Sequence, residues 1–502
     1  MRHWTVLRGS REPVHLAPQA IPARGEKRAG CEGLLQCPLP MDAYTLEFEG
    51  EFYLFDVQSC TLIAADRIAS DILNLSATHT EPQILDILGN RYRKVEVIEG
   101  FQELELLIHS GFLHRCEDTP QHYLPDFDEV HALPIRLLSL GLTAICNMSC
   151  SYCFEKPGPR SVLKRINPQV ATRAFDWLLE RSGSVAKLYL RFFGGEPLLN
   201  FPAIESVASY AAAKAHERNK DVTFLLNTNG TLLDETILDF ICKYRVGVCI
   251  SMDGRDRYHN IHRRFKNGHD SFDKVELGVR ELLKRRGGDI QAQAVLTRQT
   301  CDGLEEMPHF FRDMGFDGVY VGFVDGSQDD SYSLSEEFLK GLYGDYVNIL
   351  ESCMIAAQPC RFNLAGHDKI LRRLYRGEAA CYGCPTHAGI SMVHVDPTGD
   401  IYPCYRLLTQ ELCLGNVAKV TPAAQVDQIR KGFADNNVYE NECRKCWARY
   451  LCGGVCPAQS PPSTDWPEHC NHRERLALNL GLYIRLWSKH RPLLDALYGA
   501  GV

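Results

Sequence analysis

The sequence predicts an α/β protein centred on an open, partial (β/α)6 barrel of the TIM type, with a small α+β domain before it and a cysteine-rich domain after it. The first observation is that short apolar runs alternate with segments of helical periodicity from residue 134 to about 330. This alternation indicates parallel strands joined by crossover helices. The second is that there are six such units, and not the eight of a closed barrel. The third is that cysteines crowd the chain after residue 380.

The composition indicates a globular protein that works in a reducing compartment. The net charge is −8 over 502 residues, without long blocks of one sign, which argues against a general nucleic-acid partner. No run of 18 apolar residues predicts a membrane span, and the N-terminus lacks the apolar core of a secretory signal. The 21 cysteines therefore favour metal ligation in the cytoplasm over disulfides. Residues 1–41, rich in Pro, Arg and Gly, predict a disordered tail, and Met41 is an alternative start.

Residues 42–117 predict the small α+β domain. Two runs of alternating apolar and polar residues flank Gly50 and form a hairpin. Segments of helical spacing follow at residues 68–75, 81–88 and 101–110. Residues 118–133, which contain prolines, are expected to form a linker to the barrel.

The barrel is expected over residues 134–330. Strands are predicted at residues 134–140, 188–193, 222–226, 246–251, 290–296 and 318–323. Helices are predicted at residues 170–181, 203–218, 234–243, 272–285 and 304–314. Reactive groups are expected at the C-terminal strand ends. Beyond the barrel, we expect a helical bridge at 331–380, the cysteine-rich domain at 381–480 and a C-terminal helix at 481–502.

Three thiols lie within eight residues directly after the first predicted strand. They are Cys146, Cys150 and Cys153, at the spacing C-x3-C-x2-C. Such a loop can place three thiolates around one face of an iron–sulfur cube and leave one corner without a protein ligand. Three unrelated cysteines, or half of a zinc site, are the alternatives.

This loop, with Tyr152 before its third cysteine, resembles the hallmark of the radical S-adenosylmethionine (radical SAM) superfamily. The resemblance covers roughly residues 134–480. It implies a [4Fe–4S] cluster that binds SAM and, with an electron from a donor such as flavodoxin or ferredoxin, yields a 5′-deoxyadenosyl radical. It also implies the radical SAM version of the partial barrel.

The polar residues at the predicted strand ends are candidates for binding SAM. By resemblance, the Gly-Gly-Glu segment contacts the SAM amino group and the residue after the fourth strand faces the ribose. The candidates are Tyr152, Gly194, Gly195, Glu196, Asn229, Ser251 and Asp253. An ordinary turn at Gly-Gly-Glu-Pro and a turn cap at Asp253 are the alternatives. Arg263, on a run shared with His259, would pair with a carboxylate or form a structural salt bridge. No general base is identified.

A second constellation of cysteines resembles the seven-cysteine SPASM domain, which holds two auxiliary [4Fe–4S] clusters. By resemblance, the first auxiliary set is Cys384, Cys404 and Cys456, with Cys381 as a tentative fourth ligand or an open iron. The second set is Cys443, Cys446, Cys452 and Cys470. A zinc or purely structural site is the alternative. The ten remaining cysteines are expected to be small buried hydrophobes.

Longer sequence segments indicate a branch of the family. The hairpin-then-helices order of residues 42–117 resembles PqqD-like domains, which bind a leader peptide as an added strand; a packing or dimerisation domain is the alternative. Residues 192–201 and 251–255 and the Cys-Trp-Ala phrase at 446–448 resemble maturases that form thioethers, such as SCIFF-peptide maturases and, more distantly, the quinohemoprotein amine dehydrogenase maturase. These resemblances imply a peptide or small-protein substrate.

Three alternatives to thioether formation stay open. Sulfatase-type formylglycine formation is disfavoured, because the family places a basic aspartate where this chain has Tyr405. Carbon–carbon cross-linking of peptides fits the same residues. A non-catalytic iron–sulfur electron-transfer scaffold would leave the predicted SAM pocket without a purpose.

Overall fold

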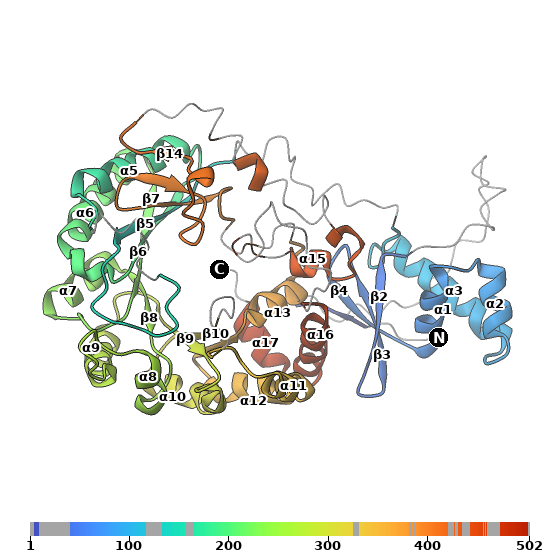
Figure 1. Ribbon diagram of the computed structural model, residues 1–502. Coiled ribbons are helices and arrows are strands. Elements are labelled where there is room, and N and C mark those ends of the chain that lie inside the picture. The colour runs from blue at the N-terminus through green and yellow to red at the C-terminus, as the bar shows by residue number, and fades with distance from the viewer. Residues whose placement is uncertain are drawn as a thin grey trace.

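A ten-stranded sheet is the centre of the computed structural model (Figure 1). The structure describes residues 5–9, 41–116, 133–155, 165–324, 331–380, 384, 387–419, 426, 430–433, 442–454, 456, 458 and 472–499. The strand order is β11-β10-β9-β8-β7-β6-β5-β12-β13-β14. Figure 1 shows the middle strands curving, with helices along the outer side of the curve.

Six parallel strands in succession confirm the predicted barrel units. They are β5 (Leu137–Thr143), β6 (Lys187–Gly194), β7 (Asp221–Thr228), β8 (Gly247–Ser251), β9 (Ile290–Leu296) and β10 (Gly318–Phe323). The helices between them are α5 (Pro168–Arg181), α6 (Phe201–Glu217), α7 (Glu235–Tyr244), α8 (Asp256–His262), α9 (Phe272–Arg285) and α10 (Met307–Met314). Strand β5 is apolar almost throughout and buried along its length, as expected for a strand covered on both faces.

The sheet extends beyond these six strands at both edges, which the sequence did not predict. Strand β11 (Arg361–Leu364) interrupts the expected helical bridge and pairs parallel with β10. On the other side, β12 (Met392–Val395) pairs parallel with β5, and β13 (Asp400–Tyr402) and β14 (Gly415–Asn416) follow antiparallel. The cysteine-rich segment therefore continues the barrel sheet. Strands of two to four residues leave too short a pattern to detect.

The bridge and the C-terminus are otherwise helical. Helices α11 (Glu336–Gly344), α12 (Tyr346–Ala357) and α13 (His367–Arg376) confirm the expected helical character of the bridge. The expected helix at 481–502 differs: α16 (His472–Lys489) begins earlier, and α17 (Arg491–Tyr498) follows as a separate helix. Pro492 in the first turn of α17 suits a new helix start and cannot continue α16.

The N-terminal region forms a second sheet of order β1-β4-β3-β2. The predicted hairpin is β2 (Ala43–Phe48) and β3 (Glu51–Asp56), and an unpredicted strand, β4 (Thr61–Ala65), pairs with β3. The helices are α1 (Arg67–Ser76), α2 (Glu81–Leu88) and α3 (Lys94–His109). The prediction of a disordered tail is wrong at Thr5–Leu7, which forms β1 and pairs antiparallel with β4. The other residues of that tail lie largely outside the described ranges.

Both faces of this small sheet are covered. Leu54 and Ile63 point to one face and pack in a core with α1, α2 and α3. Phe55 and Leu62 point to the other face and belong to the same core as the barrel, as the alternation of side chains along a strand requires. Figure 1 places α13, α16 and α17 between the barrel and this sheet.

Among the described residues, no helix is both long and apolar enough to cross a membrane.

Candidate functional site

The first cysteine loop lies directly beyond the end of β5 and is held by the end of β6. The backbone amide of Gly195 donates to Thr143 O at 2.9 Å, and that of Glu196 donates to Ile145 O at 2.9 Å. A Cβ on Gly195 would lie 2.6 Å from Ile145 O, and one on Gly194 would lie 2.4 Å from Thr143 O. The two glycines are therefore needed for close approach of two backbone segments, and this approach positions the loop.

The thiol of Cys146 accepts hydrogen bonds from two directions. The amide of Met148 donates to Sγ at 3.4 Å, and the side-chain amide of Asn229 donates to it at 3.7 Å. Asn229 also donates to Asn147 Oδ1 at 2.9 Å. Burial raises the pKa of Cys146, so these donors offset part of the cost of a thiolate there. Asn229, a predicted SAM contact, thus touches the loop itself.

Glu196 joins the ends of two strands. Its carboxylate accepts bonds from the Thr228 hydroxyl at 2.8 Å, the Leu198 amide at 3.1 Å and the Asn229 amide at 2.7 Å. Its side chain is fully buried, and burial raises its pKa to about 7. Both oxygens are occupied within the protein, so the side chain positions Asn229. A contact to the SAM amino group stays a prediction.

Asp253 anchors the other end of the loop. Its Oδ2 accepts from the Tyr152 hydroxyl at 2.5 Å and from Arg263 Nε at 3.0 Å, and its Oδ1 accepts from the Val295 amide at 2.9 Å. The Arg263 guanidinium lies 5.3 Å from the Tyr152 ring centroid. These long-range bonds exclude the turn-cap alternative for Asp253. Arg263 forms the structural salt bridge that was one of its two predicted roles.

Two buried histidines surround this network. His262 bonds to the Ser151 hydroxyl at 2.7 Å and to the Thr297 hydroxyl at 2.8 Å, and it meets the Tyr152 ring edge-on. Burial lowers the pKa of His262, and it lowers the pKa of His259 to about 4. His262 was not singled out from the sequence. Its position three residues after His259, on the same face of a helix, was the available signal.

Three aromatic side chains from separate segments meet near the first loop. The Tyr405 ring lies 4.3 Å from Phe193 at the end of β6 and 6.0 Å from Phe154 just after the loop. Phe154 is 51 % exposed, and the Arg406 guanidinium lies 5.3 Å from its ring. Burial raises the pKa of Tyr405 to about 12. Its phenol is therefore neutral near pH 7.

Of the described cysteines of the second constellation, Cys384 precedes β12, Cys404 follows β13, and the other four lie at residues 443–456 around α15 (Arg449–Cys452). Burial, together with the neighbouring thiols of Cys384 and Cys456, raises the pKa of Cys404 to about 11. The amides of Ala388 and Ala448 donate to the sulfurs of Cys384 and Cys446 at 3.3 and 3.4 Å. Cys443, Cys452 and Cys456 are half-buried. Cys381 and Cys470 lie outside the described residues.

The donor chemistry of both groups fits iron–sulfur clusters. Burial, together with the neighbouring thiols of Cys153 and Cys146, raises the pKa of Cys150 to about 11. Within the described ranges, no three His, Cys, Asp or Glu side chains are gathered to hold a metal ion. A cubane is ligated at separate corners, so its thiolates do not have to converge on one point.

Ser251 and Asp253 come at and just after the end of β8. Ser251 is half-buried, and Gln293 of β9 is its neighbour in the sheet. All seven predicted SAM contacts thus lie in the cysteine loop or at C-terminal strand ends, as expected for this architecture. Their contacts to SAM stay predictions.

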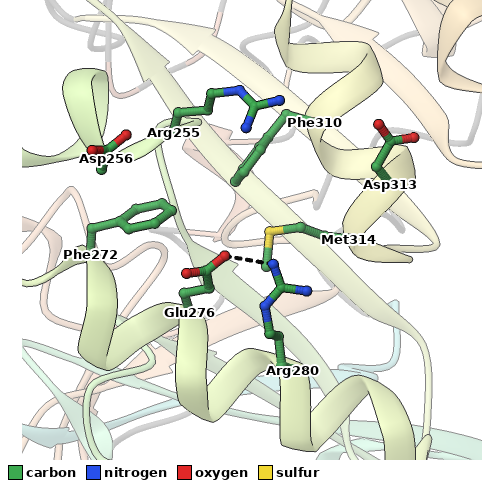
Figure 2. A pocket seen from close by; sticks show the side chains of 8 residues that line it. All are labelled: Arg255, Asp256, Phe272, Glu276, Arg280, Phe310, Asp313 and Met314. Atoms are coloured by element: carbon green, nitrogen blue, oxygen red, sulfur yellow. Dashed lines mark hydrogen bonds and ion pairs between the residues drawn. The ribbon is translucent and has the colours of Figure 1, made fainter.

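A pocket of about 170 Å³ lies on the outer helices, between α8, α9 and α10 (Figure 2). Its lining residues are Arg255, Asp256, Phe272, Glu276, Arg280, Phe310, Asp313 and Met314. Glu276 and Arg280 lie one turn apart on α9 and form an ion pair of 2.7 Å along one wall of the pocket. None of the predicted site residues lines this pocket, so it is separate from the site.

The Radical SAM superfamily model matches residues 140–295. The match spans the cysteine loop and strands β6 to β9. The chain carries a domain of the radical SAM superfamily, which confirms the resemblance seen in the sequence.

Two curated relatives and one solved structure extend the comparison. The cysteine-type anaerobic sulfatase-maturating enzyme of Clostridium perfringens (strain 13 / Type A) is 26% identical over 354 residues, 64% of this chain and 89% of that protein. The radical SAM cyclopropyl synthase TigE of Paramaledivibacter caminithermalis is 27% identical over 428 residues, 78% of this chain and 80% of that protein. The structure of native anSMEcpe with bound AdoMet has a TM-score of 0.58 and 24% identity, and covers 72% of this chain and 100% of that chain. The structural match shows a shared fold.

Proposed function

We propose that this chain is a radical SAM enzyme that modifies a peptide or small protein, forming thioether links between cysteine sulfur and a carbon of another residue. The observation that carries the proposal is the anchoring of the C-x3-C-x2-C loop at the strand ends. Asn229, Asp253 and His262 hold it from β7, from the end of β8 and from α8. Such rigid placement suits a site that must orient a reactive group.

Three groups of thiols would hold the cofactors. Cys146, Cys150 and Cys153 would hold a [4Fe–4S] cluster with one iron open to SAM. The auxiliary ligands would be Cys384, Cys404 and Cys456, with Cys381 tentative, and Cys443, Cys446, Cys452 and Cys470. When bound, SAM and the first cluster supply a 5′-deoxyadenosyl radical that removes hydrogen from an unactivated carbon, and the auxiliary clusters supply an electron acceptor.

The chain's own residues orient and shield this chemistry. Asp253 neutralises Arg263 and fixes Tyr152, so the loop keeps one conformation. The buried, neutral His262 holds Ser151 without adding charge to the site. The amide donors at Cys146 stabilise its thiolate form. The aromatic side chains of Phe154, Phe193 and Tyr405 form an apolar surface beside the loop.

The peptide substrate is supported by two features. The N-terminal sheet carries three helices on one face, the order expected of a peptide-recognition domain, and its other face packs on the enzyme core. A solved structure of anSMEcpe also holds the Cp18Cys peptide together with AdoMet. A reduced flavodoxin or ferredoxin would supply the electron, and the cytoplasm would keep the clusters reduced.

Formylglycine formation is the second candidate, because the C. perfringens relative is a sulfatase-maturating enzyme. Against it, Tyr405 stands where those enzymes have a basic aspartate, and its pKa of about 12 leaves no base at neutral pH. Carbon–carbon cross-linking of the peptide is a third candidate, because it would start from the same removal of hydrogen from a peptide carbon. A non-catalytic electron-transfer scaffold is a further alternative, and it would form no 5′-deoxyadenosine.

The test is anaerobic reconstitution followed by a SAM-cleavage assay and mass spectrometry of a co-expressed peptide. We expect 5′-deoxyadenosine and a peptide that loses two hydrogens per link while its cysteine becomes resistant to alkylation. Cys150→Ala should abolish 5′-deoxyadenosine formation and leave auxiliary iron in place. Cys242→Ala, at a half-buried cysteine outside both groups, is the matched control. Cleavage by Cys150→Ala would exclude the assignment, and a formylglycine product would favour the second candidate.

A further inference from the structure

Helix α13 presents a cationic face to the auxiliary cysteines. Its first turn follows directly after β11, at the edge of the sheet where the parallel strands end. Lys369 in this turn and Arg373 one turn later lie on the same face of the helix. Arg373 Nη1 donates to Leu451 O at 2.7 Å and to Cys452 O at 3.1 Å. This face of α13 therefore meets the end of α15, beside the second auxiliary set (Figure 1).

Lys369 lies near both auxiliary sets. Its ionisable neighbours include the thiols of Cys452, which is proposed for the second set, and of Cys384, which is proposed for the first. The side chain of His387, three residues after Cys384, in turn has Lys369 among its charged neighbours. The ammonium group of Lys369 is therefore placed between the two sets, near one thiol of each.

The ammonium group of Lys369 has no carboxylate partner among the described residues. It is half-buried, and within the described part of the chain it makes neither a hydrogen bond nor an ion pair. Its other charged neighbours, Arg373 and Arg475, repel it. The adjacent carboxylate of Asp368 accepts instead from the Tyr498 hydroxyl at 3.0 Å. A half-buried cation among like charges is costly unless negative charge faces it, and cysteine thiolates that bind iron supply such charge.

We propose that Lys369 tunes the auxiliary clusters, because its positive charge lies between them and raises the reduction potential of both. The inference rests on the proposed function, which assigns the flanking cysteines as cluster ligands. A reduced cluster is more negative than an oxidised one, so a nearby cation stabilises the reduced form. Because the ammonium group is half-buried, salt screens this effect less than it does at the surface.

A raised potential serves the proposed reaction where the thioether bond forms. A peptide thiol gives its proton to water, its sulfur bonds to the carbon radical, and one electron is left over. A higher reduction potential of the acceptor makes transfer of that electron more favourable. Lys369 thus favours the auxiliary clusters as the electron acceptor without touching the substrate.

The test is a redox titration of the reconstituted parent, Lys369→Gln and Lys369→Arg, followed by electron paramagnetic resonance. Added SAM changes the signal of the first cluster, so the auxiliary signals can be assigned separately. We expect Lys369→Gln to lower the ratio of reduced to oxidised auxiliary cluster at least tenfold at a fixed potential, which corresponds to about 59 mV for one electron. The potential of the first cluster should stay unchanged and serves as the internal reference.

Two variants control for effects other than the loss of charge. Lys369→Arg keeps the charge, and Lys419→Gln removes it from an exposed lysine of the cysteine-rich region, so both should keep the parent's auxiliary potentials. Equal auxiliary potentials for the parent and Lys369→Gln would overturn the proposal. A fall in Lys369→Arg as large as that in Lys369→Gln would do the same.

Iron content decides the matter if Lys369→Gln does not hold its auxiliary clusters. Auxiliary iron that is lost from Lys369→Gln and retained by Lys369→Arg shows that the positive charge itself is required, which supports the proposal. Loss of auxiliary iron from both variants shows that the lysine side chain acts through packing, and this result overturns the proposal.

The outcome is separable from that of the proposed function. Auxiliary potentials that follow the charge at residue 369, in a protein that forms no 5′-deoxyadenosine, refute the enzymatic role and leave the inference standing. A modified peptide together with auxiliary potentials that do not respond to substitution of Lys369 does the reverse. A parent protein that binds no auxiliary iron refutes the inference and the proposed cluster ligands together.

Discussion

The two cysteine-bearing regions of the molecule are held in place by different physical means. The first loop is fixed by buried hydrogen bonds and one buried ion pair from strand ends within the same barrel. The second, at residues 443–452, is fixed from outside by the N-terminal sheet. Trp447 stacks on Tyr44 at 4.1 Å with rings 11° from parallel, and Arg449 pairs with Asp42.

This difference shows that the first site depends on contacts from within the barrel and the second on contacts with a segment about four hundred residues away in the sequence. Removing residues 42–117 would take Phe55 and Leu62 out of the common core and expose the apolar side chains that pack against them. A deletion would therefore disturb both regions at once. Single substitutions are the way to separate them.

The largest effect is expected at Asp253. Asp253→Ala leaves the Arg263 guanidinium buried without its partner, which costs about 3–5 kcal/mol. It also frees Tyr152, so SAM cleavage should be lost. Urea unfolding and a 5′-deoxyadenosine assay measure the two effects. The exposed Asp256→Ala variant is the control, and a stability of Asp253→Ala equal to that control would contradict the argument.

A smaller effect is expected at Trp447, because its ring is only half-buried. Trp447→Ala should cost about 2 kcal/mol from lost packing and stacking. Proteases should cleave the N-terminal region faster, and auxiliary iron should fall while SAM cleavage persists. Trp487→Ala, whose ring contacts Arg491 instead, should retain iron at both auxiliary sets. Loss of SAM cleavage in Trp447→Ala would mean that the two regions are not separable.

The junction of the two regions predicts a pH dependence. His394 lies on β12, bonds to the Ser139 hydroxyl at 3.1 Å, and has its pKa lowered to about 3 by burial. Its unfolded pKa is near 6.5, so the stability it contributes is present above pH 6.5 and is lost as pH falls toward 3. By pH 5 the loss is about 2 kcal/mol.

His394→Gln should therefore reduce the fall in unfolding free energy between pH 7 and pH 5. The exposed His309→Gln variant should keep the parent's pH profile. Identical profiles for both variants would show that His394 does not couple to the folding equilibrium.

The smallest effect is expected at Tyr405, which lies between the two regions. Tyr405→Phe keeps the ring contacts with Phe193 and Phe154, so stability should change by less than about 0.5 kcal/mol and product formation should be unchanged. A tenfold loss of product with normal peptide binding would instead make the phenol a participant in catalysis.

Much of the fold could be predicted because its signals are local. The apolar periods marked the six barrel strands within a few residues, and the spacing of Cys146, Cys150 and Cys153 marked the site. Strands β11 and β12 escaped because four residues carry too little pattern. The role of Glu196 in joining two strand ends could not be predicted, because a glutamate that binds a ligand and one that binds neighbouring strands look identical in the sequence.

By itself, the sequence determined the barrel, the radical SAM loop and the candidate ligands, since each is written in contiguous residues or in the spacing of one residue type. Only the tertiary structure decided that Thr5–Leu7 completes the second sheet, that Tyr44 supports Trp447 and that Asp253 joins Tyr152 to Arg263. Those contacts link residues that lie from ten to four hundred positions apart. They depend on which surfaces meet, and no local pattern encodes that choice.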